Sequence, residues 1–323
     1  MALPVSWFRI FIGDENVIES EQIKQAVADE NWQNVLNLIE ANLDEIQINS
    51  KLNYFFVLSL FQTKHYVEGL KYANDAVDFY MQDEQGRELY FSLMLACQDF
   101  LDAHRFLGVL HKHHFEDLQE FEAKLMTAES EARKQSQTLN QRLKKFYHIG
   151  DLAIVAANKA LEAAKELPAT EYFQAAQFIF VDPFVHPLIR ATVLENVVLM
   201  GQQGTISYYW LDKQNHDVVL DDLKGILDNP ANQKLTDSLQ KKLANRDPIM
   251  LTGISKEKDL YLSYVYPFAD QVFSDPDRWV EYWLDEYYGR IHQDGEATPS
   301  IEKWQRKFKD FTQQILDGTD YNK

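Results

Sequence analysis

The chain has 323 residues, of which 46% are hydrophobic and 25% are charged, a composition that excludes an intrinsically disordered protein. Its formal net charge of −18 argues against nucleic acid or an anionic membrane as the main partner, because both carry negative charge. Only 12 glycines and 9 prolines interrupt the sequence, which favours long helices joined by short connections.

The chain shows no features of an exported or membrane-spanning protein. Cys97 is the single cysteine, so no disulfide can form within the chain. Residues 1–13 are largely apolar but have no basic leader and no small-residue cleavage site, so no signal peptide is expected. No uninterrupted apolar stretch approaches the length of about 18 residues that a spanning helix needs. We therefore expect a cytoplasmic protein.

Three aromatic residues, Trp32, Tyr66 and Phe100, follow one another at intervals of 34 residues. Small or apolar residues repeat at the same interval before and after them, in the sets Ile23, Val57, Phe91; Ala26, Leu60, Met94; Val35, Gly69, Ala103; and Ile39, Ala73, Leu107. A fixed period of this length is typical of stacked two-helix units, which bury their apolar faces against one another. The spacing predicts three helical hairpins over residues 14–115.

The middle unit resembles the tetratricopeptide repeat (TPR) family. The resemblance is carried by Tyr54-Phe55-Phe56-Val57, by His65-Tyr66-Val67-Glu68-Gly69-Leu70-Lys71-Tyr72-Ala73 and by Ala76. It implies a right-handed solenoid in which the first helix of each hairpin lines a peptide-binding groove. The residues that the resemblance places in this groove are Tyr54, Leu58, Phe61, Gln62, Glu88, Ser92 and Leu95.

Aromatic and aliphatic groups with a few polar ones suit an extended or helical peptide. The alternative is that part of the set forms core between stacked helices. Some family members clamp a terminal carboxylate with lysines and asparagines. Tyr54, Leu58 and Glu88 do not have that chemistry, so a clamp of this kind is not expected.

Residues 116–200 are predicted to continue helically, in a long helix and degenerate repeats. Residues 116–147 contain no glycine or proline, and the polar stretch 127–138 predicts either one long helix or two helices broken in the middle. A coiled-coil helix is a weaker alternative, because fewer than three clean heptads are present. Further helices are predicted over 152–167, 170–180 and 188–200. His186 precedes Pro187 and is expected to fix a turn rather than to transfer protons.

A β-hairpin is predicted near residues 205–220, as an insertion over 201–222. Residues 205–211 are rich in β-branched and aromatic side chains, residues 212–217 form a polar turn, and residues 218–220 are apolar again. An isolated hairpin is marginal in water, so it must lie against the helices or pair with something. With residues 186–190 and 262–267, this arrangement is similar to a set of TPR-like proteins of Gram-positive bacteria, which implies no particular activity.

Residues 223–323 are predicted to form a C-terminal helical region. Helices are expected over 221–227, 231–243, 257–273 and 277–288, and Ser300 is expected to cap a last, amphipathic helix. The apolar stripe of that helix, at spacings of three and four residues, is Ile301, Trp304, Phe308, Phe311 and Ile315. It indicates a helix that closes the solenoid; the alternative is a detachable segment that occupies a groove.

No catalytic constellation is recognisable. His104, His111 and His114 could share one helix face and hold a transition metal, but no cysteine or fixed carboxylate pattern accompanies them. The sequence has no phosphate-binding glycine loop, metalloprotease motif, G-x-S-x-G motif or paired zinc cysteines. We therefore predict no catalytic residues, no metal and no cofactor.

Together these features predict an all-α, TPR-like solenoid with an inserted hairpin, acting as a non-enzymatic scaffold. The expected partner is a protein or peptide of basic or apolar character, and neither nucleic acid nor a membrane. Two alternatives stay open, a peptide-sensing regulatory receptor and a hydrolase or phosphatase with an unrecognised site. The oligomeric state also stays open, with the last helix and the hairpin edge as candidate dimer contacts.

Overall fold

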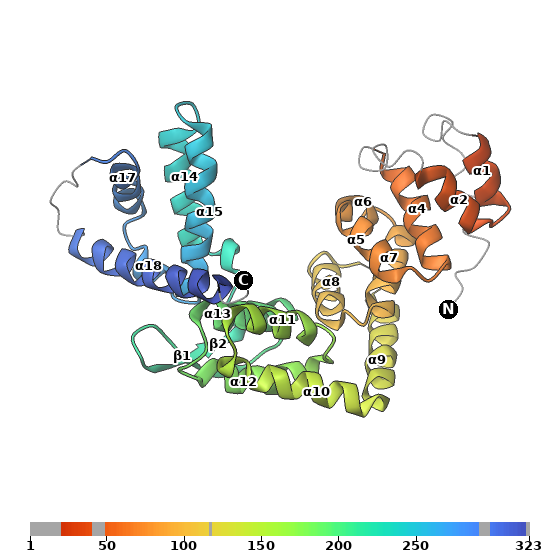
Figure 1. Ribbon diagram of the computed structural model, residues 1–323, viewed down its shortest axis with the longest axis horizontal. Coiled ribbons are helices and arrows are strands. Elements are labelled where there is room, and N and C mark those ends of the chain that lie inside the picture. Colours follow the sequence, from red (N-terminus) through yellow and green to blue (C-terminus); the bar gives the residue numbers. More distant parts are fainter. Residues whose placement is uncertain (1–20, 41–48, 116–117, 291–297, 321–323) are drawn as a thin grey trace. The chain divides into compact units, whose positions relative to one another are not determined.

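The computed structural model describes residues 21–40, 49–115, 118–290 and 298–320 (Figure 1). Within these residues the protein is mostly helical, with one small antiparallel hairpin, as the sequence predicts. No helix in the described ranges is long and apolar enough to cross a membrane. The expectation for residues 1–13 lies outside the described residues. The chain divides into two compact units, residues 1–134 and residues 135–323, and each is described by itself.

The first unit is a series of paired helices. They are α1 Glu21–Ala28, α2 Trp32–Glu40, α4 Ser50–Gln62, α5 Tyr66–Asn74, α6 Val77–Tyr80, α7 Glu84–Ala96, α8 Phe100–Lys112 and α9 Leu118–Lys134. Helices that follow one another pack together, and α7 also packs against α4 and α9. Trp32, Tyr66 and Phe100 each begin the second helix of a pair, so the three aromatic residues hold equivalent places.

The turn that joins the helices of a pair has the same backbone geometry in all three pairs. Glu30, Lys64 and Gln98 have φ of 53°, 66° and 58°. The N–H of the next residue donates to the carbonyl of Ala26, Leu60 or Met94, at 2.9, 2.8 and 2.9 Å. This left-handed cap satisfies carbonyl groups that a helix end leaves without partners. The 34-residue interval of the sequence thus corresponds to a recurring turn.

The repeated apolar positions form the interior of the first unit. The residues nine and six positions before each aromatic residue are all buried, and so are those three positions after it. At one of these positions, Gly69, an added Cβ would lie 3.0 Å from Leu93 Cδ2 and 3.4 Å from Leu60 Cβ. The small residue is therefore needed because α5 approaches α4 and α7 closely there.

Two glycines give a matched pair of expected effects on stability. A Cβ at Gly86, in the first turn of α7, would lie 2.6 Å from the Tyr80 carbonyl oxygen, which is backbone and cannot move aside cheaply. Gly86→Ala should therefore lower the free energy of unfolding by about 1–3 kcal/mol. Gly253 lies inside α15 (Pro248–Val265), where an added Cβ meets nothing within 4 Å. Gly253→Ala should raise the free energy of unfolding by about 0.5–1 kcal/mol through helix propensity.

Urea unfolding of the full chain, followed by circular dichroism, measures both changes. A rise in midpoint for both variants would show that the contact at Gly86 relaxes without cost.

The second unit combines helices with the hairpin. Its elements are α10 Ser136–Tyr147, α11 Ile154–Ala164, α12 Ala169–Val181, α13 Pro187–Leu199, β1 Thr205–Tyr209, β2 Asn215–Val219, α14 Pro230–Leu243, α15 Pro248–Val265, α16 Ala269–Val272, α17 Pro276–Tyr287 and α18 Thr298–Asp320. Because α9 ends at Lys134 and α10 begins at Ser136, the helix breaks at Gln135, inside the polar stretch, so the prediction of two helices is confirmed.

The hairpin lies against the helices, as an isolated hairpin must to be stable. β1 pairs with β2 from Thr205 opposite Val219 to Tyr209 opposite Asn215, and β1 packs on α12. The predicted turn over 212–217 was too long, because residues 215–217 belong to β2. Residues 215–217 form a strand because their backbone groups hydrogen-bond to β1. Backbone pairing does not require apolar side chains, so the polar sequence did not reveal it. Tyr208 and Trp210 donate hydrogen bonds to the carbonyls of Tyr266 and Val265, at 3.2 and 3.1 Å.

Three predicted helix boundaries differ from the structure. The segment predicted over 221–227 consists of two 3₁₀ turns, Leu220–Asp222 and Ile226–Asp228. The helix predicted over 257–273 is α15, which begins nine residues earlier because Asp247 accepts a hydrogen bond from the Met250 N–H at 3.0 Å and caps it. It also ends earlier, at Val265, before Pro267, and α16 forms a separate short helix. The last helix begins at Thr298, before the predicted cap Ser300.

The apolar stripe of α18 packs into the second unit. Phe308 is fully buried and stacks on Tyr261 at 4.4 Å between ring centroids. The ring centroids of Trp304 and Trp210 lie 5.9 Å apart, and those of Phe311 and Tyr264 lie 5.4 Å apart. Ile301 and Phe308 are thus part of the core of this unit, and the rest of the stripe is partly buried against it.

Candidate binding site

The structure buries most of the predicted peptide groove in the first unit. The buried members are Tyr54, Leu58, Phe61 and Glu88, and the partly exposed ones are Gln62, Ser92 and Leu95. All ten residues from Leu52 to Phe61 of α4 are buried, which is typical of a helix surrounded by neighbours. The buried side chains cannot touch a partner in this conformation. A groove that uses the three partly exposed residues stays a prediction.

The buried polar member of that set, Glu88, joins two helices. Its carboxylate accepts hydrogen bonds from Lys124 at 2.6 Å and from Ser92 at 3.3 Å. Lys124 also pairs with Glu120 at 2.7 Å, so this cluster fastens α9 to α7. The arrangement leaves Glu88 with a structural role inside the first unit.

The three histidines considered as metal ligands are not brought together. His104 lies 2.8 Å from the Glu129 carboxylate, whereas His114 follows the end of α8 with φ of 56°. In the described part of the chain, no group of three or more histidine, cysteine, aspartate or glutamate side chains is placed to hold a metal ion.

Large apolar side chains are exposed on the second unit. Phe178 of α12 is 62% exposed and contacts the ring of Tyr147 at 5.3 Å. Phe184, in the loop between α12 and α13, is 84% exposed, and Leu152, between α10 and α11, is 38% exposed. Single exposed apolar residues are normal, but several beside surface hollows are typical of interaction sites.

Three adjoining hollows connect these residues. The first, of about 420 Å³, lies between α10 and Phe178 and is lined by Asn140, Leu143, Lys144, Tyr147 and His148. The second, of about 550 Å³, shares Lys144 and His148 with it and adds Gln141, Lys145 and Leu152. Leu152 also lines a third hollow of about 200 Å³. We call the residues that line these three hollows, together with Phe178, the candidate surface.

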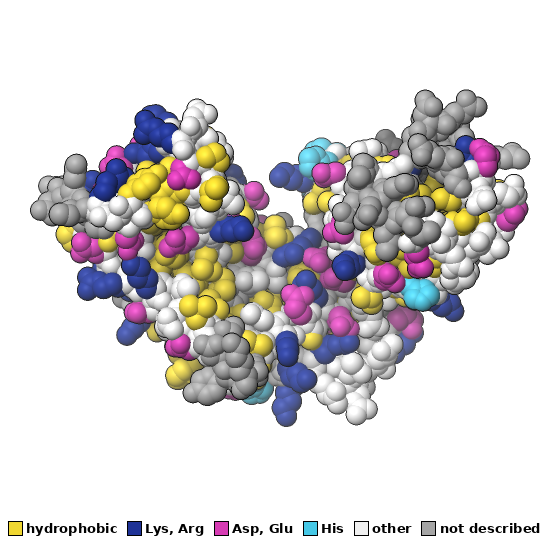
Figure 2. Space-filling model, turned by 45° about the horizontal axis from the view of Figure 1, so that its top comes forward, with side chains coloured by type: hydrophobic (Ala, Val, Ile, Leu, Met, Phe, Trp, Pro, Cys, Tyr) yellow, Lys and Arg dark blue, Asp and Glu magenta, His cyan; other side chains and the backbone are white. Residues whose placement is uncertain are grey.

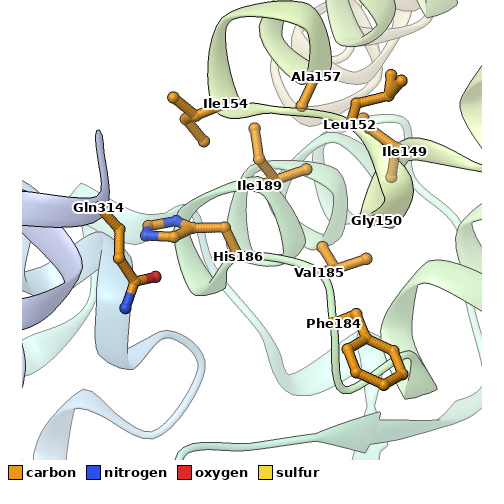
Figure 3. Close-up of a pocket in the computed structure, with 10 residues that line it drawn as sticks. All are labelled: Ile149, Gly150, Leu152, Ile154, Ala157, Phe184, Val185, His186, Ile189 and Gln314. Carbon is orange, nitrogen blue, oxygen red and sulfur yellow. The ribbon is translucent and has the colours of Figure 1, made fainter. Parts of the chain in front are cut away.

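The third hollow is a small pocket, which we call the His186 pocket; most of its lining residues are apolar, but about half of its accessible wall is polar (Figure 3). Its lining residues are Ile149, Gly150, Leu152, Ile154, Ala157, Phe184, Val185, His186, Ile189 and Gln314. Figure 3 shows His186 and Gln314 side by side at one end, with the ring of Phe184 at the other. Ligand sites usually combine apolar walls with a few placed polar groups, and a volume of about 150 Å³ is enough to hold a benzene ring.

His186 joins α13 to α18 through both ring nitrogens. Its Nδ1 accepts a hydrogen bond from the Leu188 N–H at 3.2 Å and caps α13, so the side chain has a structural role at the start of this helix. Its Nε2 lies 3.3 Å from the Phe311 carbonyl oxygen and must donate to it. These two partners select the neutral tautomer with hydrogen on Nε2. Burial lowers the pKa of His186, the bond to Phe311 opposes this shift, and the charge of Arg190 adds to it.

His186 should make stability depend on pH. Because its folded-state pKa lies below the unfolded value of about 6.5, the unfolded state takes up the proton first as the pH falls. The stabilisation is complete above about pH 6.5 and is lost below it, by at most about 1.4 kcal/mol per pH unit. Unfolding free energies of the wild type and His186→Gln, measured from pH 7.5 to 5, should converge toward acid pH. His148→Gln, at an exposed position, serves as the control for exchanging a histidine for glutamine in this unit.

The loop that carries Phe184 and His186 is held by a buried arginine. Arg190, which is 2% exposed, donates to the carbonyls of Asp182, Val185 and Tyr209, the last two at 2.9 and 3.0 Å. Its guanidinium also lies 5.3 Å from the ring centroid of Tyr209. Arg190 thus ties the loop to β1 and fixes the position of Phe184 at the edge of the pocket.

Two exposed lysines, Lys144 and Lys145, border the candidate surface in the last turn of α10. Within the described ranges neither forms an ion pair. Elsewhere the charges are mixed: Figure 2 shows acidic and basic side chains interspersed over the face turned to the viewer. The lysine pair therefore places two positive charges at the α10 edge of the candidate surface, whereas the carboxylates of Asp151 and Asp182 lie near His148 and Gly150.

Comparison with known proteins does not assign a function to the candidate surface. No protein-family model, curated protein or solved structure matches the chain. The function is therefore inferred from the folded chain and its candidate surface alone.

Proposed function

We propose that the protein is a TPR-type helical scaffold that binds a protein or peptide through the candidate surface of its second unit. The observation that carries this proposal is the exposure of Phe178 and Phe184, at 62% and 84%, beside adjoining hollows. Large aromatic side chains are frequent energetic hot spots of interfaces, because they bury much area at small entropic cost. Left in water, the two rings cost free energy that a partner would recover.

The first unit supports the scaffold part of the proposal. Its helix pairs recur at 34 residues with one turn geometry, and each pair packs on the next. In TPR-type solenoids such stacking builds a framework with extended surfaces for partners. We propose the same organisation here, with the stacked pairs as framework and the second unit as the site of contact.

The proposal is tested by capture of partners from a native lysate on immobilised full-length protein. Phe178→Ala combined with Phe184→Ala should reduce recovery of a partner about tenfold or more, because two apolar anchors are lost. Both residues are exposed, so the variant should keep the wild-type circular dichroism spectrum. The matched control is Ile249→Ala, which removes an 85% exposed side chain of α15 in the same unit. Equal recovery with all three proteins would show that the candidate surface is not the binding site.

A further inference from the structure

We propose that the candidate surface takes an acidic peptide segment, one apolar side chain of which enters the His186 pocket. This inference rests on the proposed function and adds the chemistry of the partner. Three features carry it: the size of the pocket, the polarity of its walls and the charge at its edge.

The size of the pocket suits one side chain. Its volume of about 200 Å³ exceeds the roughly 150 Å³ of a cavity that binds benzene. A leucine or phenylalanine side chain therefore fits, whereas a folded domain does not. Phe184 and Leu152 stand at the opening, where the rest of a peptide would pass.

The polarity of the walls favours an uncharged occupant. Ile154, Val185 and Ile189 supply apolar walls from three segments of the chain (Figure 3). The polar group deepest in the fold, His186, already has hydrogen bonds at both ring nitrogens. The other polar side chain of the lining, Gln314, is uncharged, so a charged occupant would lose hydration without gaining an opposite charge, which is costly. The pocket therefore disfavours a charged side chain, and its apolar walls suit an aliphatic or aromatic one.

The charge at the edge of the candidate surface favours acidic residues beside that group. Lys144 and Lys145 are exposed on the hollow that adjoins the pocket at Leu152. The nearby carboxylate of Asp151 faces His148 Nδ1 at 3.3 Å. Carboxylates flanking the apolar side chain would meet the two ammonium groups, which would orient the peptide and speed its association. A basic peptide, although attracted by the net charge of the protein, would be repelled at this point.

The direct test uses synthetic peptides and the full-length ¹⁵N-labelled protein. The probe is a capped heptapeptide with a central leucine flanked by glutamates. One control peptide has glycine in place of leucine, and a second has lysines in place of the glutamates. The probe should produce saturable shift changes of amides in residues 149–157 and 184–189. The glycine peptide should bind about tenfold or more weakly, since the apolar group is missing, and the lysine peptide should not bind.

Two protein variants separate the role of charge from that of the pocket. Lys144→Glu combined with Lys145→Glu should weaken the probe about tenfold or more, whereas the matched pair Lys234→Glu and Lys241→Glu, exposed on α14, should not. Gln314→Trp, at an exposed position of the pocket edge, should block entry of the leucine. Raising the salt from about 50 to about 500 mM should weaken the probe, because exposed charges are then screened.

The outcomes distinguish this inference from the function on which it rests. Equal binding of the leucine and glycine peptides, a preference for the lysine peptide, or no effect of the Lys144 and Lys145 reversal would overturn the inference. Absence of peptide binding would also overturn it. If the Phe178 and Phe184 variant still loses its partner in such a case, the scaffold function stands and only the acidic partner is wrong.

Discussion

Arg190→Ala is expected to lower the free energy of unfolding of the second unit by about 3–5 kcal/mol. The substitution removes the donors to three backbone carbonyls and leaves a cavity at a position that is 2% exposed. The Val185 carbonyl is buried, and a buried acceptor without a partner costs about 1–3 kcal/mol. The bonds to Asp182 and Tyr209 are partly buried, and the Asp182 carbonyl still accepts from the Val185 N–H at 3.4 Å. The cavity left by the large side chain therefore supplies much of the loss. Burial lowers the pKa of Arg190, but a guanidinium remains charged in proteins and needs these carbonyls.

Urea unfolding of the full-length protein measures this change, with Arg246→Ala, at an exposed position, as control. Arg190→Lys should recover only part of the stability, because one ammonium cannot reach three separated carbonyls as a planar guanidinium does. A midpoint unchanged by Arg190→Ala would mean that water or a rearranged loop satisfies the carbonyls. The same variant should also bind partners less well, because Arg190 positions the loop with Phe184.

Phe308→Ala is also expected to lower the free energy of unfolding of the second unit by about 3–5 kcal/mol, but for a different reason. Phe308 is fully buried, and its ring stacks on Tyr261 at 4.4 Å and lies 6.1 Å from Trp279. Truncation of a buried phenylalanine loses its transfer free energy and leaves a cavity among rigid aromatic rings. The matched control is Phe184→Ala, which removes an exposed phenylalanine of the same unit and should change stability by at most about 0.5 kcal/mol.

This variant also decides between the two interpretations of α18. If α18 closes the core, Phe308→Ala lowers the urea concentration at the unfolding midpoint of the whole second unit, and tryptophan fluorescence measures this midpoint. If the helix is a detachable segment, proteolysis releases α18 early while the remaining transition keeps its midpoint. The second outcome would revive the interpretation of α18 as a ligand for a groove.

Periodicity determined much of the helical framework. The 34-residue interval located the start of the second helix in each pair, because the turn before it needs the same backbone geometry each time. The enrichment of residues 205–211 in β-branched and aromatic side chains located the hairpin, although not the polar residues of its second strand. The predicted boundaries were wrong where a cap or backbone pairing, rather than apolar spacing, defines the end of an element, as at Asp247.

The candidate surface could not be predicted from the spacing of apolar residues. The TPR resemblance identified apolar positions of the first unit such as Tyr54 and Leu58, but α4 is covered on all sides and buries them. The spacing of apolar residues predicts that a helix has an apolar face, but it does not predict whether a neighbouring helix covers that face. Phe184 gave only a faint signal, an aromatic residue in a turn after Asp182-Pro183 where polar residues are usual.

The sequence by itself therefore determined the helical class, the repeated turn and the hairpin, because these depend on residues close together in the chain. Only the tertiary structure decided which apolar groups are buried, and that Lys144, Leu152, Phe184 and Gln314 border adjoining hollows. The net charge of −18 suggested a basic partner, whereas the local lysines favour an acidic one. The physical reason is that binding depends on the few groups within about a Debye length of the site, and folding decides which groups those are.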